Sequence, residues 1–332
     1  MQTPQDLSDM VVAVVGATGF VGRSVVSRLL DRGACVRALA RSMDKASRVL
    51  PEHANLSIIQ STLFEPDKTL DRALDGAQAI VNTVGIIREE PDGQSFERLH
   101  IQLPRLLVEA ARAHQSGPGR IVHISALSVQ ENADTEYARS KFAGEQIIRH
   151  SGLDWTILRP GLIHGPGSAF MQMIRDWAYG RAMPFFCMPY FARTTKIFPK
   201  PEFEPPRVEP IFVDDVAGVV AASLERDISI GEVYPLVGSQ SLLMPEMYTF
   251  VRDRLPLARS TIKPFAIPSN LAAYKAKASK ALGMGALLPF DEGMAKMGAR
   301  DCTGQSTKAH EHLGFEPIGF AKSAETYIAQ MT

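Results

Sequence analysis

The sequence predicts an α/β protein in which a doubly wound parallel sheet is followed by a smaller, mixed C-terminal lobe. Three observations lead to this prediction. A β-branched run near the N-terminus precedes a glycine turn and a helix, strands and helices then alternate, and this alternation stops after residue 167. We expect one domain over residues 1–165 and a lobe over residues 166–332 that forms a substrate or partner surface. Residues 208–238 are expected to return to the sheet of the first domain.

Composition and charge restrict the class of protein. The chain has 332 residues, of which 45% are hydrophobic and 22% charged, as in a folded globular protein. Lys+Arg and Asp+Glu both number 36, so the formal net charge is zero. This balance gives no field of one sign to attract nucleic acid, and we expect no nucleic-acid partner.

The cysteines and the N-terminus indicate the compartment. The 3 cysteines are odd in number and scattered, which predicts neither a disulfide framework nor a zinc site. The first residues lack the pattern of a signal peptide. No apolar run reaches the roughly 20 residues that a membrane-spanning helix needs. We expect a cytoplasmic protein without a transmembrane segment, and a peripheral position at the inner membrane face stays open.

The N-terminal segment has the pattern of a dinucleotide site. Residues 10–15 (MVVAVV) read as a strand buried on both faces, and residues 16–22 (GATGFVG) follow directly, before a helix. Gly16 permits a tight turn, Gly19 lets the backbone approach a pyrophosphate, and Gly22 lets the helix lie close to the strand. The alternative is a glycine turn that only packs. The order of strand, turn and helix favours cofactor binding.

The end of the second strand, over residues 34–40, indicates which cofactor is used. An acidic residue there would bind the ribose hydroxyls of NAD, whereas Arg41 can hold the 2′-phosphate of NADP through charge-assisted hydrogen bonds. Arg37 lies on the same strand and is expected to assist. The alternative is that Arg41 is a solvated residue at a helix start. We favour NADP(H) over NAD(H).

Alternation continues through the first half and predicts a Rossmann-type sheet. The expected strands cover residues 55–60, 77–85, 119–126 and 153–161, and the expected helices cover residues 66–76, 95–114 and 135–145. Pro104 is expected to kink the second of these helices or to mark its true start. Ligands bind at the carboxyl ends of parallel strands. The residues expected at those ends are Arg41, Thr62, Thr83, Gly85, Ser125 and Pro160.

Tyr137 and Lys141 are candidates for an acid/base pair. On a helix, side chains four residues apart share a face, so both can point to one spot. An ammonium beside a phenol favours the phenolate and so assists proton transfer near neutral pH. The spacing alone arises easily by chance. Its place after the fifth strand of a nucleotide-binding sheet favours a functional pair.

Several motifs together carry a family resemblance. They are GATGFVG (16–22), NTVG (82–85), YARSK (137–141), LRPGLIHGPG (158–167) and VEPIFVDDVA (208–217). In combination they resemble the extended and atypical short-chain dehydrogenase/reductases, which include NAD-dependent epimerase/dehydratase-like proteins. The sequence is most similar to the branch that contains the NADPH-binding accessory subunit of respiratory complex I and its bacterial relatives.

The resemblance implies roles for individual residues. Lys141 matches the ribose-binding lysine and Tyr137 the catalytic tyrosine, while Arg41 would hold the 2′-phosphate. The further cofactor contacts that it implies are Gly16, Thr18, Gly19, Phe20 and Val21 for the pyrophosphate, Thr62 and Leu63 for the adenine, Thr83, Val84 and Gly85 for the nearer ribose, and Pro160 to Ile163 for the carboxamide.

Two positions depart from the family pattern. Thr62 stands where many relatives have aspartate, which alters the adenine contact. Ala126 stands where the enzymes have their catalytic Ser or Thr, so Ser125 or Ser128 would have to donate the hydrogen bond. The short interval between Ser125 and Tyr137 also differs from that of sugar-nucleotide epimerases.

The second half has weaker patterns. Residues 170–181 predict an amphipathic helix, and residues 208–225 a strand that runs into a helix. Residues 183–207 are expected to be irregular; they combine aromatic and basic side chains. This segment could be a substrate lid, a membrane or partner surface, or a loop that closes the lobe. From residue 260 we expect short helical pieces, and we expect no metal site.

Three functions fit these observations. The first is an NADPH-dependent oxidoreductase or isomerase acting on a small molecule or a quinone-type ligand. The second is a non-catalytic accessory or assembly subunit that holds NADPH in a respiratory complex. The third is a regulator that senses the ratio of NADPH to NADP⁺. Tyr137, Lys141 and Ser125 carry the first function, whereas Ala126 favours the second.

Overall fold

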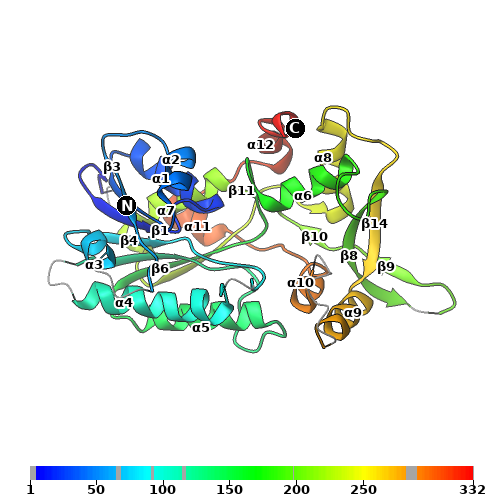
Figure 1. Cartoon of the computed structure of the whole chain (residues 1–332), viewed down its shortest axis with the longest axis horizontal. Helices are drawn as coiled ribbons and strands as arrows, with labels where there is room; N and C mark the ends of the chain where they lie inside the picture. Colours follow the sequence, from blue (N-terminus) through cyan, green and yellow to red (C-terminus); the bar gives the residue numbers. More distant parts are fainter. Residues whose placement is uncertain are drawn as a thin grey trace. The chain divides into compact units, whose positions relative to one another are not determined.

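A computed structural model of the protein describes residues 5–64, 69–90, 93–113, 117–196, 198–281 and 290–331 (Figure 1). The chain divides into two compact units, each assembled from separated segments. The first unit consists of residues 1–160, 213–236 and 305–316, and the second of residues 161–212, 237–304 and 317–332.

The first unit is built on a seven-stranded sheet in which every pairing is parallel. In spatial order its strands are β12 (Glu232–Leu236), β6 (Asp154–Pro160), β5 (Arg120–Ile124), β4 (Ala79–Asn82), β1 (Val11–Val15), β2 (Cys35–Ala40) and β3 (Leu56–Gln60). The order reverses direction between β1 and β4, which is where a doubly wound sheet binds its ligand. This topology confirms the predicted fold class.

Helices cover both faces of this sheet. Figure 1 shows α1, α2 and α7 on one face and α3, α4 and α5 on the other. These helices, and the shorter ones of this unit, are α1 (Phe20–Asp31), α2 (Met43–Val49), α3 (Thr69–Leu74), η1 (Glu97–Gln102), α4 (Leu103–Ala113), α5 (Glu136–Arg149), α7 (Val213–Glu225), η2 (Asp227–Ser229) and α11 (Thr307–Leu313).

Alternate residues of the strands form the core beneath α3, α4 and α5. Val15, Ile80 and Ile121 point to this face and pack with Leu107 and Ile148 from the helices. Successive strand residues point to opposite faces, so a strand covered on both sides must be apolar throughout. The burial of Val12 to Val15 in β1 meets this requirement.

The second unit contains a small mixed sheet with the order β14–β8–β9, in which β14 runs parallel and β9 antiparallel to β8. Its elements are β7 (Ile163–His164), α6 (Ala169–Ala178), β8 (Cys187–Lys196), β9 (Glu202–Glu204), β10 (Arg207–Val208), β11 (Ile211–Phe212), β13 (Leu242–Leu243), α8 (Met244–Arg254), β14 (Lys263–Pro268), α9 (Ser269–Ala281), α10 (Glu292–Met297), α12 (Phe320–Glu325) and η4 (Ile328–Gln330).

Two expectations for this unit were wrong. Residues 183–207 are not irregular, because they contain β8 and β9, and the segment after residue 260 begins with the strand β14 before its helices. Both strands contain proline, which disfavours a strand interior, so the sequence pattern does not indicate a strand at either place. The β8–β14 pairing tolerates Pro189 opposite Phe265, and it joins segments that lie far apart in the sequence.

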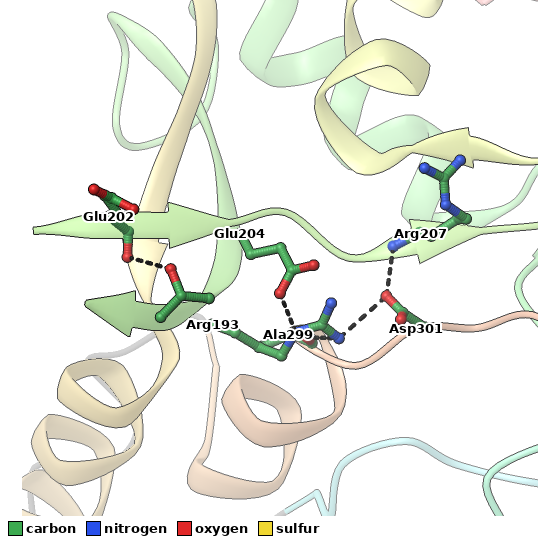
Figure 2. A network of polar contacts seen from close by, with 7 residues as sticks. Arg193, Glu202, Glu204, Arg207, Ala299 and Asp301 are labelled. Carbon is green, nitrogen blue, oxygen red and sulfur yellow. Dashed lines mark hydrogen bonds and ion pairs between the residues drawn. The ribbon is translucent and has the colours of Figure 1, made fainter.

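Polar contacts join β8, β9, β10 and the segment after α10 in the second unit. Figure 2 shows Arg193 between Glu204 and Asp301, with guanidinium-to-carboxylate distances of 3.3 and 3.1 Å. Asp301 also accepts a hydrogen bond of 2.8 Å from the main-chain nitrogen of Arg207. Exposed pairs of this kind add little stability individually. We therefore expect the network to orient the antiparallel strands β8 and β9, and to contribute little to the free energy of unfolding.

No helix in the described part of the chain is long and apolar enough to cross a membrane. The same residues contain no group of three or more His, Cys, Asp or Glu side chains that could hold a metal ion.

Candidate functional site

The turn between β1 and α1 is so tight that it requires glycine. Gly16 has a φ of +82°, in the left-handed region. A β-carbon at Gly16 would lie 2.8 Å from Oγ1 of Thr83, and one at Gly22 would lie 2.1 Å from the carbonyl oxygen of Gly16. The nitrogen of Gly19 donates to that same oxygen at 2.9 Å. At the end of β1 the turn therefore presents main-chain atoms that no side chain of these glycines covers.

The N-terminus of α1 keeps its main-chain donors available. Gly19 is the N-cap and offers no side-chain acceptor, and the first turn contains no acidic residue. Phe20 and Val21 form this first turn and Thr18 precedes it, and all three side chains are partly exposed. A helix end with free N–H groups and a positive dipole end suits a phosphate. The geometry fits the pyrophosphate of a dinucleotide.

The two arginines of β2 and its end have different surroundings. Arg41 is exposed, and among the described residues its guanidinium has no hydrogen bond or ion pair. Ser42, next to it, caps α2 by accepting a hydrogen bond of 3.2 Å from the nitrogen of Lys45. The guanidinium of Arg37 instead donates to main-chain oxygens at the end of α3, including that of Ala73 at 3.2 Å. The expected help from Arg37 is therefore not supported, because it caps a helix.

The end of β3 forms a fixed corner. Ser61 is buried, and its hydroxyl accepts hydrogen bonds from the nitrogen of Leu63 at 3.1 Å and from Oγ1 of Thr69 at 2.9 Å. Leu63 takes a φ of +67°, which is unusual for a residue with a side chain. Thr62 is exposed. The corner therefore leaves Thr62 exposed at the carboxyl end of β3, whereas Leu63 packs against the core of the first unit.

The end of β4 is held by a buried amide. Oδ1 of Asn82 accepts from the nitrogen of Val84 at 3.1 Å, and its Nδ2 lies 3.1 Å from Nδ1 of His123. Thr83 donates its hydroxyl to the main chain of β1 at 2.9 Å. Gly85 follows and is exposed. The strand end is therefore rigid, and the small residue leaves room beside it.

Lys141 lies fully buried behind Gly85. Its ammonium donates to the carbonyl oxygen of Ile124 at 3.1 Å, and a β-carbon at Gly85 would approach Nζ to 2.8 Å. Burial lowers the pKa of Lys141 to about 8, although the negative charge of Glu145 opposes this shift. The lysine can therefore change its protonation close to neutral pH.

A buried carboxylate supports Lys141 from the next turn of α5. Glu145 is fully buried and forms a bidentate pair with Arg159 of β6, at 2.8 Å to Nε and 2.5 Å to Nη2. Such a pair is held in one geometry by two parallel hydrogen bonds. It anchors α5 to the sheet and places negative charge on the helix face that carries Lys141.

His100 joins the helix of Tyr137 to the end of β4. Nε2 of His100 accepts a hydrogen bond of 3.2 Å from the main-chain nitrogen of Ile86, so Nδ1 carries the proton and donates to Oγ of Ser140 at 2.8 Å. Burial, with a smaller effect of the Lys141 charge, lowers the pKa of His100 to about 2. The ring also contacts Tyr137 at 5.7 Å between centroids. His100 is therefore a buried histidine with a hydrogen-bond partner at both ring nitrogens.

A π-helical turn brings His100 into this position. The nitrogen of Leu103 bonds to the oxygen of Arg98, five residues earlier, and Pro104, the second residue of α4, has no N–H to offer to His100. The carbonyl oxygen of His100 instead lies against Gly144, where a β-carbon would approach it to 2.1 Å. Pro104 thus lies at the start of α4, and Gly144 allows α5 to lie against the π-helical turn.

The candidate catalytic hydroxyls differ in exposure. Ser125 is buried and its Oγ has no hydrogen-bond partner, whereas Ser128 is exposed. Ala126, between them, is partly exposed. Nε2 of His123 is also buried without a partner, although its Nδ1 is bonded. Tyr137 lies partly exposed on α5. Of the two serines, only Ser125 holds an unpaired buried hydroxyl at the end of β5.

The last two predicted contacts belong to different units. Pro160 ends β6 in the first unit, where its oxygen accepts a hydrogen bond of 3.0 Å from Leu127. Ile163 lies in β7 of the second unit. Gly161 and Leu162 also belong to the second unit, and the first unit carries the remaining cofactor and catalytic residues that the sequence predicts.

The sequence reasoning missed Ser140 and Glu145. Glu145 follows Tyr137 and Lys141 at the same spacing of four, so one helix face carries all three side chains. That spacing was a usable signal. The contact of Ser140 with His100 joins segments far apart in the chain, and no local pattern indicates it.

Comparisons with known proteins agree with this geometry. Residues 16–170 match the family model described as NAD(P)H-binding. Over 268 residues, 79% of this chain, the sequence is 24% identical to NADH dehydrogenase [ubiquinone] 1 alpha subcomplex subunit 9, mitochondrial, of Mus musculus. The match spans 65% of that subunit's length. The sequence is also 35% identical over 159 residues to the ceramide reductase of Caulobacter vibrioides, covering 47% of each chain.

Among solved structures, the fold is similar to that of the epimerase Mth375 from Methanothermobacter thermautotrophicus. The TM-score is 0.72, with 16% sequence identity, and the match covers 97% of this chain and 92% of that one. The fold, the glycine turn and the matched relatives lead to one conclusion. Residues 16–170 contain an NAD(P)-binding domain, and the relatives in sequence and fold support an atypical short-chain dehydrogenase/reductase close to the branch of the complex I subunit.

Proposed function

We propose that the protein binds NADP(H) in its first unit and acts as an oxidoreductase on a carbonyl-type substrate. The observation that carries this proposal is the buried ammonium of Lys141, which lies beside Gly85 with a pKa of about 8. Tyr137 stands one helical turn before it. The identity of 35% to a ceramide reductase, across 47% of the chain, also favours reduction.

In the proposed mechanism the bound nicotinamide supplies the hydride, and the residues of the chain handle the proton. Lys141 binds the ribose and stabilises the negative charge that develops on Tyr137. Tyr137 gives its proton to the substrate oxygen. Ser125 donates its unpaired hydroxyl to the same oxygen, in place of the hydroxyl that Ala126 lacks.

Tyr137→Phe tests the catalytic part of this proposal. The substitution removes the proton donor, so turnover of carbonyl and quinone substrates should fall roughly 10²- to 10⁴-fold. NADPH affinity, measured by fluorescence titration, should stay within a factor of a few because Lys141 is intact. Unchanged turnover of every substrate that the parent accepts would remove Tyr137 from the mechanism.

Arg41 tests the choice of cofactor. Its exposed guanidinium suits a 2′-phosphate. We expect Arg41→Ala to weaken NADPH binding roughly tenfold or more and to leave NADH binding unchanged. Lys45→Ala, an exposed cation on the neighbouring helix α2, is the matched control. Equal losses for both cofactors would contradict a 2′-phosphate site.

A second candidate function is a non-catalytic accessory or assembly subunit that holds NADP(H) in a respiratory complex. It is favoured by Ala126 and by the similarity to a complex I subunit over 79% of this chain. Native purification, with the nucleotide identified by mass spectrometry, separates the two candidates. Retained NADP(H) without turnover, together with co-purified membrane subunits, would favour the accessory role. A third role, sensing the NADPH/NADP⁺ ratio, requires unequal affinities for the two forms.

A further inference from the structure

Two loops of the second unit expose large apolar side chains. The α6–β8 loop (residues 179–186) presents Met183 and Phe186, which are 68% and 76% exposed, and Phe185 is exposed beside them. The α8–β14 loop (residues 255–262) presents Leu257, which is 96% exposed. Side chains of this size normally lose water on folding, so their exposure on two loops invites a functional explanation.

Direct contacts make the two loops one surface. The hydroxyl of Tyr179 donates to the main-chain oxygen of Pro256 at 2.8 Å, and the nitrogen of Arg259 donates to the oxygen of Ala178 at 3.1 Å. A β-carbon added at Gly180 would lie 3.2 Å from the guanidinium of Arg259. The loops also lead into β8 and β14, which pair in parallel from their first residues (Figure 1). We call this surface the loop pair.

Internal hydrogen bonds hold the loop pair in a defined shape. The indole of Trp177 donates to the oxygen of Met183 at 2.9 Å, and Arg252 donates to the oxygen of Ile262 at 2.9 Å. Leu257 has a φ of +62°, a conformation that residues with side chains seldom adopt. The side chain of Leu257 is therefore almost fully exposed to solvent, and its backbone has a conformation that glycine adopts more easily.

The charged residues within the two loops and at the start of β14 are all positive. Arg181, Arg259 and Lys263 are exposed, and in the described part of the chain none of them forms an ion pair. Residues 179–187 and 255–265 contain no Asp or Glu. The loop pair thus combines protruding apolar groups with cations that have no counter-charge within it.

We propose that the loop pair is a docking surface for an anionic lipid membrane. Met183, Phe185, Phe186 and Leu257 would enter the boundary between headgroups and acyl chains, while the cations bind lipid phosphates. A lipid surface fits because large exposed apolar side chains and unpaired cations occur together on these two loops, with no Asp or Glu within them. The proposal concerns the second unit and does not depend on the function proposed for the first.

Vesicle flotation of the full chain tests this proposal. We expect binding to vesicles of phosphatidylcholine mixed with phosphatidylglycerol, and much weaker binding to phosphatidylcholine alone. Leu257→Ser and Phe186→Ser should each weaken binding roughly tenfold, because each removes one inserted apolar group. Arg259→Glu should weaken binding to the anionic vesicles more than fivefold, and this loss should shrink at high salt.

Matched substitutions in the first unit provide the controls. Ile228→Ser changes another exposed apolar residue and Arg105→Glu another exposed cation, and both should bind vesicles like the parent chain. Thermal unfolding is measured on the same preparations, so loss of vesicle binding with an unchanged unfolding transition excludes misfolding of the second unit.

Three outcomes would overturn the proposal. These are no binding of the parent chain to anionic vesicles at low salt, equal binding by the loop-pair variants, and equal losses in the controls. If Leu257→Ser instead abolished self-association of a chain that ignores vesicles, the surface would belong to a second copy of the protein.

Discussion

The two units of the molecule differ in which side chains lack partners: buried polar groups in the first unit and exposed apolar groups in the second. Among the described residues, the four buried side-chain atoms without a hydrogen-bond partner all lie in the first unit, on His123, Ser125, Arg149 and Arg226. In the second unit, buried His164 bonds to the hydroxyl of Tyr327 at 2.9 Å. Conversely, of the thirteen large hydrophobic side chains that are exposed in the described part of the chain, ten lie in the second unit.

This difference separates two kinds of molecular recognition. An unpaired buried polar atom is costly unless a ligand or water completes it, so the first unit is arranged to receive a small polar molecule. An exposed apolar side chain is costly unless another surface covers it, so the second unit is arranged to meet a surface. The following four changes test this division.

Acidification should produce the largest difference between the two units in the free energy of unfolding. The folded-state pKa values of His100 and His123 are about 2 and 3, and that of His164 is about 4, all below the ordinary 6.5 and mainly because of burial. As the pH falls below about 6.5, the unfolded chain gains protons that the folded histidines do not, so the free energy of unfolding falls. At pH 5 each histidine contributes a loss of roughly 2 kcal/mol.

Two of these histidines lie in the first unit and one in the second. We therefore expect the first unit to lose roughly 4 kcal/mol at pH 5 and the second roughly 2 kcal/mol. Native-state amide hydrogen exchange at pH 7 and pH 5 measures the opening of each unit separately. The asymmetry would be refuted if the second unit became the less protected one on acidification.

A matched pair of glycine substitutions compares packing in the units. A β-carbon at Gly144 would lie 2.1 Å from the oxygen of His100, and one at Gly238 would lie 2.0 Å from the oxygen of Pro210. Since main chain must move in both cases, Gly144→Ala and Gly238→Ala should each lower the free energy of unfolding by about 3 kcal/mol. Only Gly144→Ala should also weaken NADPH binding, because it moves the helix of Lys141. Denaturant titration and nucleotide titration give the two quantities.

Lys141→Met should weaken NADPH binding 10- to 100-fold, roughly the value of one charge-assisted hydrogen bond. Lys275→Met, an exposed lysine of the second unit, is the control and should bind NADPH normally. The pKa of Lys141 is about 8 in the folded chain and 10.5 ordinarily. The unfolded chain therefore binds more protons between these values, and the free energy of unfolding should rise with pH from about 8 to 10.5. A rise that persists in Lys141→Met would come from another group.

Two serine substitutions should give the smallest effects and opposite results. Ser125→Ala removes a buried hydroxyl without a partner, so stability should stay the same or increase slightly. Ser323→Ala removes a hydroxyl that bonds to the oxygen of Gly319 at 3.0 Å, and it should lower stability by about 1 kcal/mol. Thermal unfolding measures both changes. Clear destabilisation by Ser125→Ala would mean that its hydroxyl already has a partner in the free protein.

The fold of the first unit was predictable because its signals are local. The run before Gly16 is apolar at every position, as a doubly covered strand requires, and the turn follows at once. The sheet of the second unit was not predictable, because β8 and β14 contain prolines and pair across a long stretch of chain. Local pattern shows neither the partner nor the register of such strands.

The candidate site was partly predictable for the same reason. Tyr137 and Lys141 share a helix face, which spacing alone reveals. The bond between His100 and Ser140 depends on the π-helical turn before Pro104, and the pairing of Glu145 with Arg159 depends on packing of a helix on a strand. Only the folded chain brings these partners together.

The way in which the chain passes between the units has a consequence for its synthesis. The first unit is completed by β12 at residues 232–236 and by α11, which ends at Leu313. Because a ribosome delivers the N-terminus first, residues 11–160 emerge long before β12, the edge strand beside β6, exists. Until then β6 exposes an open strand edge, which can pair with another chain. The edge of β6 is therefore covered only after β12 has been synthesised. A fragment that ends before residue 232 should aggregate.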